Sequence, residues 1–465
     1  MFPDANAEGK IECFPFRSDA DAGSVMDISI IRELTSLRIL VSIILGAGIL
    51  FCPRKWLLFW IPFLPYSGIW LYAPDNPREY IFISSYIELI LALLFLRRFF
   101  ISKMDHISVG LFVITLFSLP SLYNAFHYQH FSLSLFLLIC LLGGAGVYTC
   151  FLDHMKEILA SHWVDVAVVI WLILGIFIKI YLGARLNQPW FIQRGGGILG
   201  SNHVAGVLFL LLPLVKSRWI ILLTLLFLVL QFSRGIYLAL FIYVAVWITM
   251  VNPRQGLRWL IFTGIAAVVV FLLIADISFQ SEYGLVTIKD FILSRFKIIQ
   301  KVSVKFLLEG LMSDSRWDII NSAFIIGRQA FFTGIGFGGF MWGLERLGEP
   351  LLYTNAHNMY VTLLVEGGFA FAFGIYGLLI YLLIVAFRTS KKIFAGFLTW
   401  IFYGFYAAEI YETGGMVTAG DYYILLFVIA AIFYLHRHSD DFLSSRGIAE
   451  CSRISCKTGL QFHPQ

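Results

Sequence analysis

The chain contains few charged residues and no long polar domain. Of its 465 residues, 14% are charged and 59% are hydrophobic, which gives a mean hydropathy of +0.82. Soluble domains carry about a quarter charged residues, so this composition excludes an ordinary soluble protein. The apolar runs are continuous rather than alternating, which excludes an outer-membrane barrel, whose strands alternate apolar and polar residues.

Cysteine is scarce, and its spacing indicates no metal site. The six cysteines include no C-x-x-C pair and lie in or beside apolar runs or in the polar ends of the chain. We therefore predict neither a disulfide framework nor a zinc site. The formal charge of +5 does not indicate nucleic acid binding, because the basic residues are scattered through short loops, as membrane orientation requires.

What the chain does contain is a series of apolar runs, each near the length of about 20 residues that crosses a bilayer. We predict an all-α polytopic membrane protein with about 12 to 13 transmembrane helices. No cleavable signal peptide is expected, since the first run begins near Leu37 behind a polar leader. The runs lie at 36–52, 55–72, 80–96, 107–124, 132–152, 163–183, 198–215, 218–232, 235–251, 258–275, 359–387, 393–411 and 421–436.

Polar segments divide the chain into parts, with one large extracytoplasmic loop between the late helices. Within that loop, 294–308 is expected to be an amphipathic surface helix and 315–332 a further helix. The expected parts are a polar leader (1–34), a transmembrane bundle (35–275), the loop (276–356), C-terminal transmembrane helices (357–437) and a polar tail (438–465).

Basic residues recur in alternate short loops, which in membrane proteins are cytoplasmic. The 276–356 loop then lies outside. Thirteen full spans would place the N-terminus outside as well, but prolines interrupt 36–72, and we expect this region to be divided differently. The basic residues are Arg97, Arg98, Lys103, Lys156, Lys216, Arg218, Arg254, Arg258, Arg388, Lys391 and Lys392.

One histidine stands where a Gly-rich polar segment gives way to an apolar helix. The segment begins at Gly334 and ends in Ala356-His357-Asn358, and the helix follows at once. This places the His357 imidazole at the membrane surface, and histidine is the side chain best suited to proton transfer near neutral pH. An interfacial hydrogen-bonding residue would fit the same position.

Three arginines, Arg194, Arg234 and Arg316, lie at outward-facing ends or in outer loops. Arg234 separates two apolar runs with no charged residue nearby in sequence. An arginine near the hydrocarbon is costly and usually has a partner or a function. Guanidinium groups bind phosphate oxygens bidentately, so together they could hold a pyrophosphate without a metal. A topological anchor or a structural salt bridge is the alternative.

Other residues have mainly structural interpretations. Gly336 and Gly338 follow no predicted strand, so they do not form a dinucleotide-binding loop. A close-packed turn is the simpler interpretation of these glycines. The backbone amides of such a turn could still approach phosphate oxygens. Asn202 or Ser201 most simply caps the helix that follows. Glu366 lies nine residues after His357, on the opposite side of a regular helix, so no direct contact is expected.

Three segments together resemble the O-antigen ligase and polymerase superfamily of bacterial envelope glycosyltransferases. They are GGGILGSNHVAG, FSRGIYLAL and RWDIINSAFIIGRQAFFTGIGFGGF followed by NAHNMYVTLLVEGG, within about 190–375. The resemblance implies an inverting enzyme that needs neither metal nor cofactor. It would transfer a glycan from undecaprenyl pyrophosphate to an acceptor hydroxyl on the outer side of the bacterial inner membrane, in contact with membrane lipids and without nucleic acid.

The resemblance also implies roles for individual residues. His357 would activate the acceptor hydroxyl, and the donor pyrophosphate would be bound by Arg234, Arg316 and Arg194. The supporting residues would be Asn358, Asn202, Gly336, Gly338 and Glu366.

Several functions remain open. A ligase would place the glycan on lipid A-core, which the large outer loop favours; a polymerase would extend a lipid-linked chain; a third type would glycosylate proteins. A transporter or flippase would require charged residues inside the bundle and pseudo-symmetric halves, and no internal repeat is visible. A non-catalytic scaffold would leave His357 and Arg234 dispensable.

Overall fold

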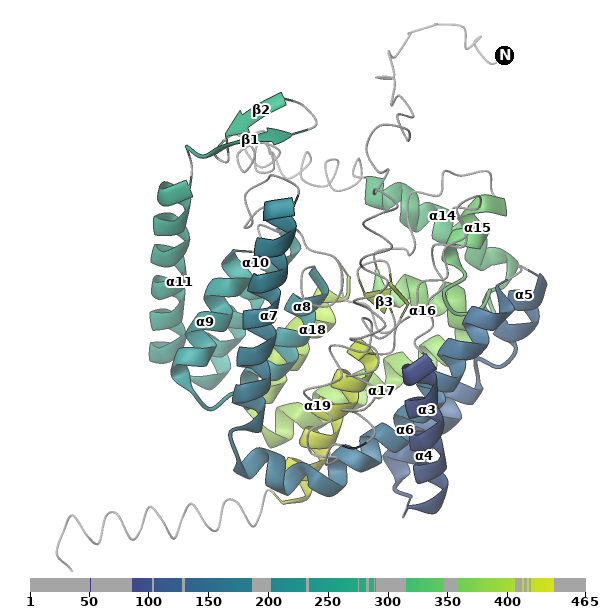
Figure 1. Ribbon diagram of the computed structural model, residues 1–465. Coiled ribbons are helices and arrows are strands. Elements are labelled where there is room, and N and C mark those ends of the chain that lie inside the picture. Colours follow the sequence, from purple (N-terminus) through teal and green to yellow (C-terminus); the bar gives the residue numbers. More distant parts are fainter. Residues whose placement is uncertain are drawn as a thin grey trace, which may run out of the picture.

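The structure, a computed structural model, is almost entirely helical (Figure 1). The helices are α3 (Tyr86–Ile101), α4 (His106–Leu116), α5 (Ser121–His127), α6 (Phe131–Ala160), α7 (Trp163–Arg185), α8 (Asn202–Leu211), η4 (Leu212–Leu214), α9 (Arg218–Val229), α10 (Arg234–Val246), η5 (Trp247–Val251), α11 (Pro253–Ile274), α14 (Ser315–Gln329), α15 (Phe340–Arg346), α16 (Met359–Gly367), α17 (Phe369–Thr389), α18 (Lys391–Tyr403) and α19 (Gly420–Arg437). The residues described are 51, 86–102, 104–127, 130–185, 202–230, 234–274, 276–281, 284–287, 289, 315–346, 358–405, 412–413, 416–417 and 420–438.

The predicted all-α polytopic membrane fold is confirmed. Within the described residues, three helical segments are long and apolar enough to cross a membrane: His106–His127, Leu133–Ala160 and Phe369–Thr389. Shorter apolar helices stand beside them (Figure 1). The first two apolar runs of the sequence, the polar leader and the polar tail lie largely or wholly outside the described ranges.

Helix α6 packs against α3 at unusually short range. A Cβ atom added to Gly143 would lie 2.7 Å from the carbonyl oxygen of Ala92, and one added to Gly146 would overlap that of Phe95. Without a hydrophobic drive between helices in lipid, close backbone approach through small residues provides the packing energy. These two glycines therefore set the separation of α3 and α6.

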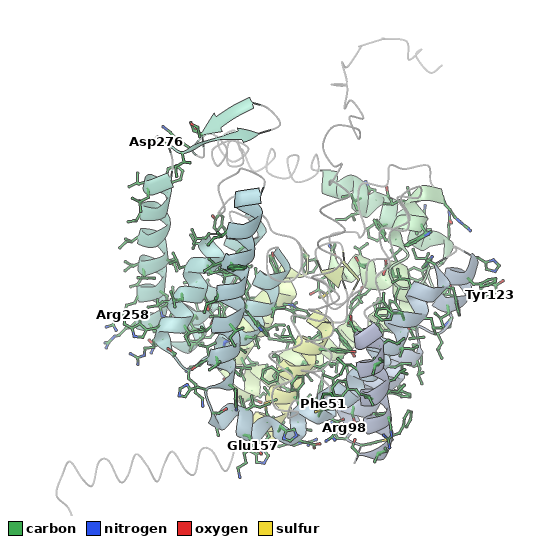
Figure 2. All side chains as sticks on the ribbon, in the orientation of Figure 1. Phe51, Arg98, Tyr123, Glu157, Arg258 and Asp276 are labelled. Carbon is green, nitrogen blue, oxygen red and sulfur yellow. The ribbon has the colours of Figure 1, made fainter. Side chains whose placement is uncertain are left out.

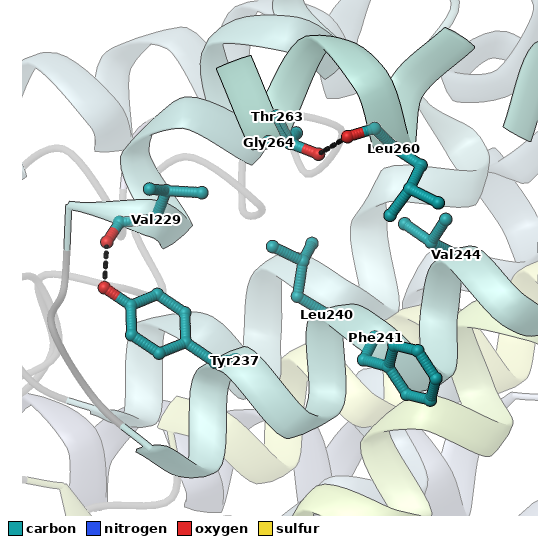
Figure 3. A pocket seen from close by; sticks show the side chains of 8 residues that line it. All are labelled: Val229, Tyr237, Leu240, Phe241, Val244, Leu260, Thr263 and Gly264. Atoms are coloured by element: carbon teal, nitrogen blue, oxygen red, sulfur yellow. Dashed lines mark hydrogen bonds between the residues drawn. The ribbon is translucent and has the colours of Figure 1, made fainter. Parts of the chain in front are cut away.

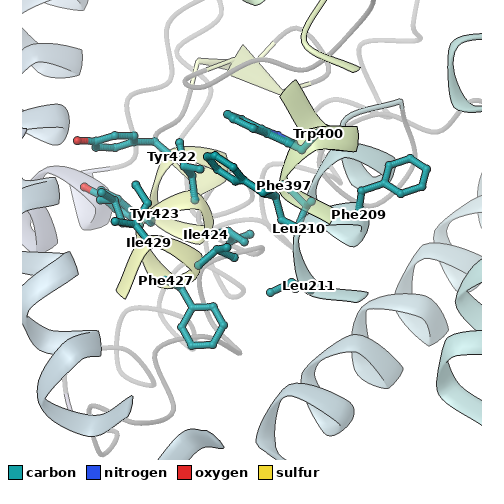
Figure 4. Packing of buried hydrophobic residues seen from close by; sticks show 14 of the residues in the cluster. Phe209, Leu210, Leu211, Phe397, Trp400, Tyr422, Tyr423, Ile424, Phe427 and Ile429 are labelled. Atoms are coloured by element: carbon teal, nitrogen blue, oxygen red, sulfur yellow. The ribbon is translucent and has the colours of Figure 1, made fainter. Parts of the chain in front are cut away.

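The core between α8, α18 and α19 is filled by large apolar side chains (Figure 4). Phe209 on α8, Phe397 on α18 and Phe427 on α19 are each fully buried. Gly396 lets α18 approach α8, since a Cβ there would lie 2.5 Å from the carbonyl oxygen of Phe209. This core holds the C-terminal helices against the earlier part of the chain.

A π-helical turn, η5, joins α10 to α11. The amide of Asn252 donates to the carbonyl oxygen of Trp247 at 3.0 Å, five residues back. Trp247 lies against Trp259 of α11, with 4.6 Å between ring centroids. The base of the α10–α11 pair is therefore fixed, whereas the far half of α11 carries exposed apolar residues such as Leu272 and Leu273.

Some basic residues near the helix ends are paired within the protein. Arg98 pairs with Asp153 at 2.6 Å, and Arg437 pairs with Asp105 at 3.0 Å. Figure 2 places Arg98 and Glu157 at one end of the bundle and Asp276 at the opposite end. The Nζ atom of Lys216 donates to the carbonyl oxygens of Ala160 and Ser161, at 3.0 and 2.8 Å.

Several elements differ from the sequence expectation. The apolar run 359–387 forms two helices, α16 and α17, because Gly368 adopts φ +82° and breaks the run. In the 276–356 segment, α14 confirms the helix expected at 315–332, whereas the helix α15 and a small antiparallel hairpin, β1 (Ser278–Ser281) and β2 (Gly284–Thr287), were not expected. A second hairpin pairs β3 (Glu412–Thr413) with β4 (Met416–Val417). The expected surface helix at 294–308 lies outside the described part of the chain.

We expect Gly146→Ala to destabilise the protein by about 1–3 kcal/mol, the usual effect of overpacking. The added methyl overlaps the Phe95 carbonyl and forces α3 and α6 apart. The measurement is the midpoint of thermal unfolding in detergent. The control is Gly110→Ala, because a Cβ at Gly110 meets nothing within 4 Å. Equal midpoints for the two variants would contradict the close crossing.

Candidate functional site

The start of α16 is anchored to the end of α18. The amide of Met359 donates to the carbonyl oxygen of Gly404 at 2.9 Å, and the Tyr360 hydroxyl donates to that of Ile401 at 2.7 Å. The Tyr376 hydroxyl of α17 donates in turn to the carbonyl oxygen of Tyr360. The backbone directly after His357 is therefore held from two sides.

Asn358 is the N-cap of α16. Its Oδ1 atom accepts from the amides of Tyr360 at 3.1 Å and Val361 at 3.2 Å, which satisfies two donors that have no partner within the helix. Its Nδ2 atom lies 3.5 Å from the carbonyl oxygen of Phe405. The side chain is buried, and it couples the helix start to the end of α18.

Two helices from the N-terminal half of the chain, α8 and α10, also pack near the end of α18. Gly206 of α8 faces Tyr403, since a Cβ there would lie 3.4 Å from the Tyr403 ring. Phe209 lies between Tyr403 and Tyr243 of α10, with ring centroids 6.2 and 6.0 Å away. The end of α18 is thus a meeting point for α8, α10 and α16.

Several predicted site residues lie on these elements. Asn202 begins α8, Arg234 begins α10, and Arg316 is in the first turn of α14, although the placement of their side chains is not described. His357 and Arg194 lie outside the described residues, and His357 directly precedes the Asn358 cap. The structure therefore brings the start of α16 and Gly206 of α8 to the end of α18, and Arg234 begins a helix whose Tyr243 packs against Phe209 of α8.

The Gly-rich loop, residues 334–339, adopts backbone conformations that favour glycine. Gly334, Gly336 and Gly338 have φ values of +74°, +101° and +69°. The amides of Ile335 and Gly336 donate to the carbonyl oxygens of Val365 and Glu366, at 2.9 and 3.0 Å. The loop therefore caps the C-terminal end of α16, whose last carbonyls have no partner inside the helix.

The Glu366 carboxylate makes a second connection to the same loop. Its Oε2 atom accepts from the Gly338 amide at 2.7 Å, and Oε1 accepts from the Phe340 amide at 3.0 Å. Phe340 begins α15, so the carboxylate also lies at that helix start. The amides of Gly336 and Gly338 thus donate within the protein, and a phosphate could reach them only by displacing Glu366.

On its other side, the loop contacts the α5–α6 turn. The Nδ2 atom of Asn124 donates to the carbonyl oxygen of Gly334 at 2.7 Å, and the Ser134 hydroxyl donates to that of Phe337 at 2.8 Å. The buried His130 ring stacks on Trp342 of α15, with 5.1 Å between centroids. Sequence reasoning missed these residues, because nothing local pairs Asn124 or Ser134 with a segment 200 residues later.

A pocket of about 210 Å³ lies between α9, α10 and α11 (Figure 3). Arg234 begins α10 one turn before the first lining residue of that helix, Tyr237, whose hydroxyl donates to the carbonyl oxygen of Val229 at 2.8 Å. Phe241 at its edge is 66% exposed, so the pocket opens on the lipid-facing surface. The lining residues are Val229, Tyr237, Leu240, Phe241, Val244, Leu260, Thr263 and Gly264.

Among the residues that the structure describes, no three His, Cys, Asp or Glu side chains gather in a way that could hold a metal ion. The buried carboxylate of Glu366 instead accepts from backbone amides.

We expect Asn358→Ala to destabilise α16 by about 1 kcal/mol, the usual effect of losing an N-cap. Asn358→Ser keeps an oxygen that can accept from the same amides and should retain most of the stability. Thermal unfolding in detergent measures both variants. If Ala and Ser lowered the midpoint equally, the cap would not be the role of Asn358.

Part of the chain is similar to a known family. A family model described as O-antigen ligase matches residues 219–382, from the start of α9 into α17. No curated protein matches the chain. The matched region contains Arg234, Arg316, His357 and Glu366, whereas Arg194 and Asn202 precede it. This match supports the resemblance of the chain to the O-antigen ligase and polymerase superfamily of membrane glycosyltransferases.

Proposed function

We propose that the protein transfers a glycan from undecaprenyl pyrophosphate to an acceptor hydroxyl, by inversion and without a metal, on the outer side of the bacterial inner membrane. The match to the O-antigen ligase family model carries this proposal. The matched region contains His357, and it also contains Arg234 and Arg316, which lie in the first turns of α10 and α14. The anchored start of α16 supports it, because a reacting group needs a fixed backbone.

The chemistry divides between arginine and histidine. The glycan C1 already carries a good leaving group, and its bond to the pyrophosphate oxygen breaks as the acceptor oxygen attacks from the opposite face. Arginine stabilises the negative charge on the departing pyrophosphate, through bidentate hydrogen bonds and a charge that is never lost. We assign this task to Arg234, Arg316 and Arg194. His357 removes the acceptor's hydroxyl proton as the new bond forms.

The orientation of the chain supports an outward-facing site. Short basic loops mark the cytoplasmic side of membrane proteins, and Figure 2 draws Arg98, which follows the third apolar run, at the end of the bundle away from Asp276. Figure 1 draws α14 and α15 at the other end. In this orientation the 276–356 segment lies outside, as the proposed domain division requires.

The pocket between α9, α10 and α11 suits the apolar chain of the donor. It is lined almost entirely by aliphatic and aromatic side chains, and Phe241 marks its lipid-facing edge. Arg234 begins α10 one turn before Tyr237. A lipid-linked pyrophosphate has a charged head group at the membrane surface and an isoprenoid chain in the bilayer. Arg234 would contact the head group, and the apolar pocket would contact the chain.

The acceptor is the finer part of the proposal. We favour lipid A-core, and hence a ligase, because the large outer segment provides room for a second glycan. A polymerase would use another lipid-linked repeat, and a protein glycosyltransferase a serine or threonine hydroxyl, with the same donor chemistry.

His357→Ala should lower transfer by about 100- to 10,000-fold, the contribution of a positioned general base. Transfer is measured with the purified protein in proteoliposomes, using a lipid-linked glycan and an acceptor, while membrane abundance stays at the wild-type level. His154→Ala, near the C-terminal end of α6, is the control and should transfer normally. Near-normal transfer by His357→Ala would refute the assignment.

Arg234→Lys should fail to restore function, although the charge is retained. A point charge loses the guanidinium fork, and the loss of charge-assisted hydrogen bonds of about 1.5–3 kcal/mol corresponds to roughly 10- to 100-fold slower transfer. The same reconstituted assay measures it, with Arg258→Lys at the basic end of α11 as the control. Full activity of Arg234→Lys would show that bidentate binding is not required.

A further inference from the structure

Glu366 is a buried carboxylate that the proposed chemistry does not use. Its side chain lies in the last turn of α16 and is 1% exposed. Burying a carboxylate is costly unless hydrogen bonds compensate. Here Oε2 accepts from the Gly338 amide at 2.7 Å and Oε1 from the Phe340 amide at 3.0 Å. A residue held at this cost needs a structural or functional reason.

The loop and α16 are in direct backbone contact around this carboxylate. The carbonyl oxygen of Glu366 accepts from the Gly336 amide at 3.0 Å. A Cβ added to Gly334 would lie 2.5 Å from the amide nitrogen of Gly368 and would overlap the Glu366 carbonyl. Only glycine permits this approach at a positive φ. Both the backbone carbonyl and the side-chain carboxylate of Glu366 therefore hold the Gly-rich loop in place.

Helix α14 leads directly into this loop and packs along α16. A Cβ added to Gly327 would lie 3.2 Å from the side chain of Val365, and Ile326 packs in the same apolar cluster. The amide of Gly334 donates to the carbonyl oxygen of Ala330 at 2.6 Å, so only one tight turn separates α14 from the loop. Movement of the loop would therefore shift α14 relative to α16.

We propose that Glu366 is a positioning residue that holds α14 and α16 in one register for transfer. This inference rests on the proposed function, because α14 carries Arg316 in its first turn and the N-cap of α16, Asn358, directly follows His357. Glu366 acts through the loop and not on the substrate. Catalytic groups need placement to within about 0.5 Å, and an error of about 1 Å can cost on the order of 100-fold in rate.

The geometry requires a carboxylate at full length. Two backbone N–H groups point at two different oxygens, and a glutamine offers only one oxygen, so its NH₂ group would face an N–H donor. An aspartate lacks one methylene and would leave both amides out of reach. Thr362, one turn earlier on α16, is equally buried and makes no hydrogen bond to the loop, which makes Thr362→Val a matched control.

The test compares Glu366→Gln, Glu366→Asp and Thr362→Val in the full chain in proteoliposomes. We expect kcat to fall about 10- to 100-fold in both Glu366 variants while KM for the lipid-linked glycan changes by less than about twofold. Thr362→Val should keep both constants. A rise in KM with unchanged kcat, or no change in either constant, would overturn the proposal.

A spectroscopic measurement separates this proposal from the proposed function. Spin labels on Asn321 of α14 and Phe402 of α18, both exposed, report the α14 position relative to the anchor of α16 in a cysteine-free background. We expect the distance distribution to broaden or shift in Glu366→Gln and to stay narrow in Thr362→Val. An unchanged distribution in Glu366→Gln overturns the positioning role even if the wild type shows no transfer.

Discussion

The contact of the Glu366 carboxylate with the Gly-rich loop is the constraint on which the rest of the site depends. The loop lies between two halves of the chain, with α16 on one side and the α5–α6 turn on the other. Its three glycines with positive φ allow a backbone path that side chains would block. Without this connection, α14 and α15 would still be joined to the bundle by the small apolar cluster around Ile326 and Phe340 and by the stack of Trp342 on His130.

The membrane explains why polar groups are arranged at the ends of the bundle. In lipid, backbone polar groups must be satisfied within the protein, which favours helices with capped ends. Asn358 and the Gly-rich loop satisfy the two ends of α16, a short helix that would otherwise leave many groups without partners. The same two caps fix the helix that follows His357, so a requirement of stability also provides a rigid site.

The sequence predicts the helices well, because their apolar runs have the length that a bilayer demands. It predicts the start of α16 directly after Asn358, and the structure confirms that start. It misses the break at Gly368, because hydropathy runs across it and only the conformation of that glycine reveals it. The close crossing at Gly146 is missed because it depends on Phe95, a partner distant in sequence, whereas the π-turn after Val246 changes the hydrogen bonding within an apolar run that hydropathy does not distinguish.

The candidate site is predictable only in part. The prediction that Glu366 faces away from the His357 side of the helix follows from helical geometry, but its contact with Gly338 joins residues 28 apart through a tight loop. Asn124 and Ser134 meet the loop across some 200 residues, and no local pattern indicates such pairs. The roles of Arg234, Arg316 and His357 stay predictions that rest on family resemblance and chemistry.

The most direct test of the account is to delete the gene in its host and compare surface glycans and lipid-linked intermediates by gel electrophoresis and mass spectrometry. The account predicts that long chains disappear from the surface and accumulate on undecaprenyl pyrophosphate. Intermediates arrested at a single repeat would retain the donor chemistry but make the protein a polymerase. Unchanged surface glycans together with unchanged lipid-linked intermediates, in cells that express the wild-type protein, would contradict the account.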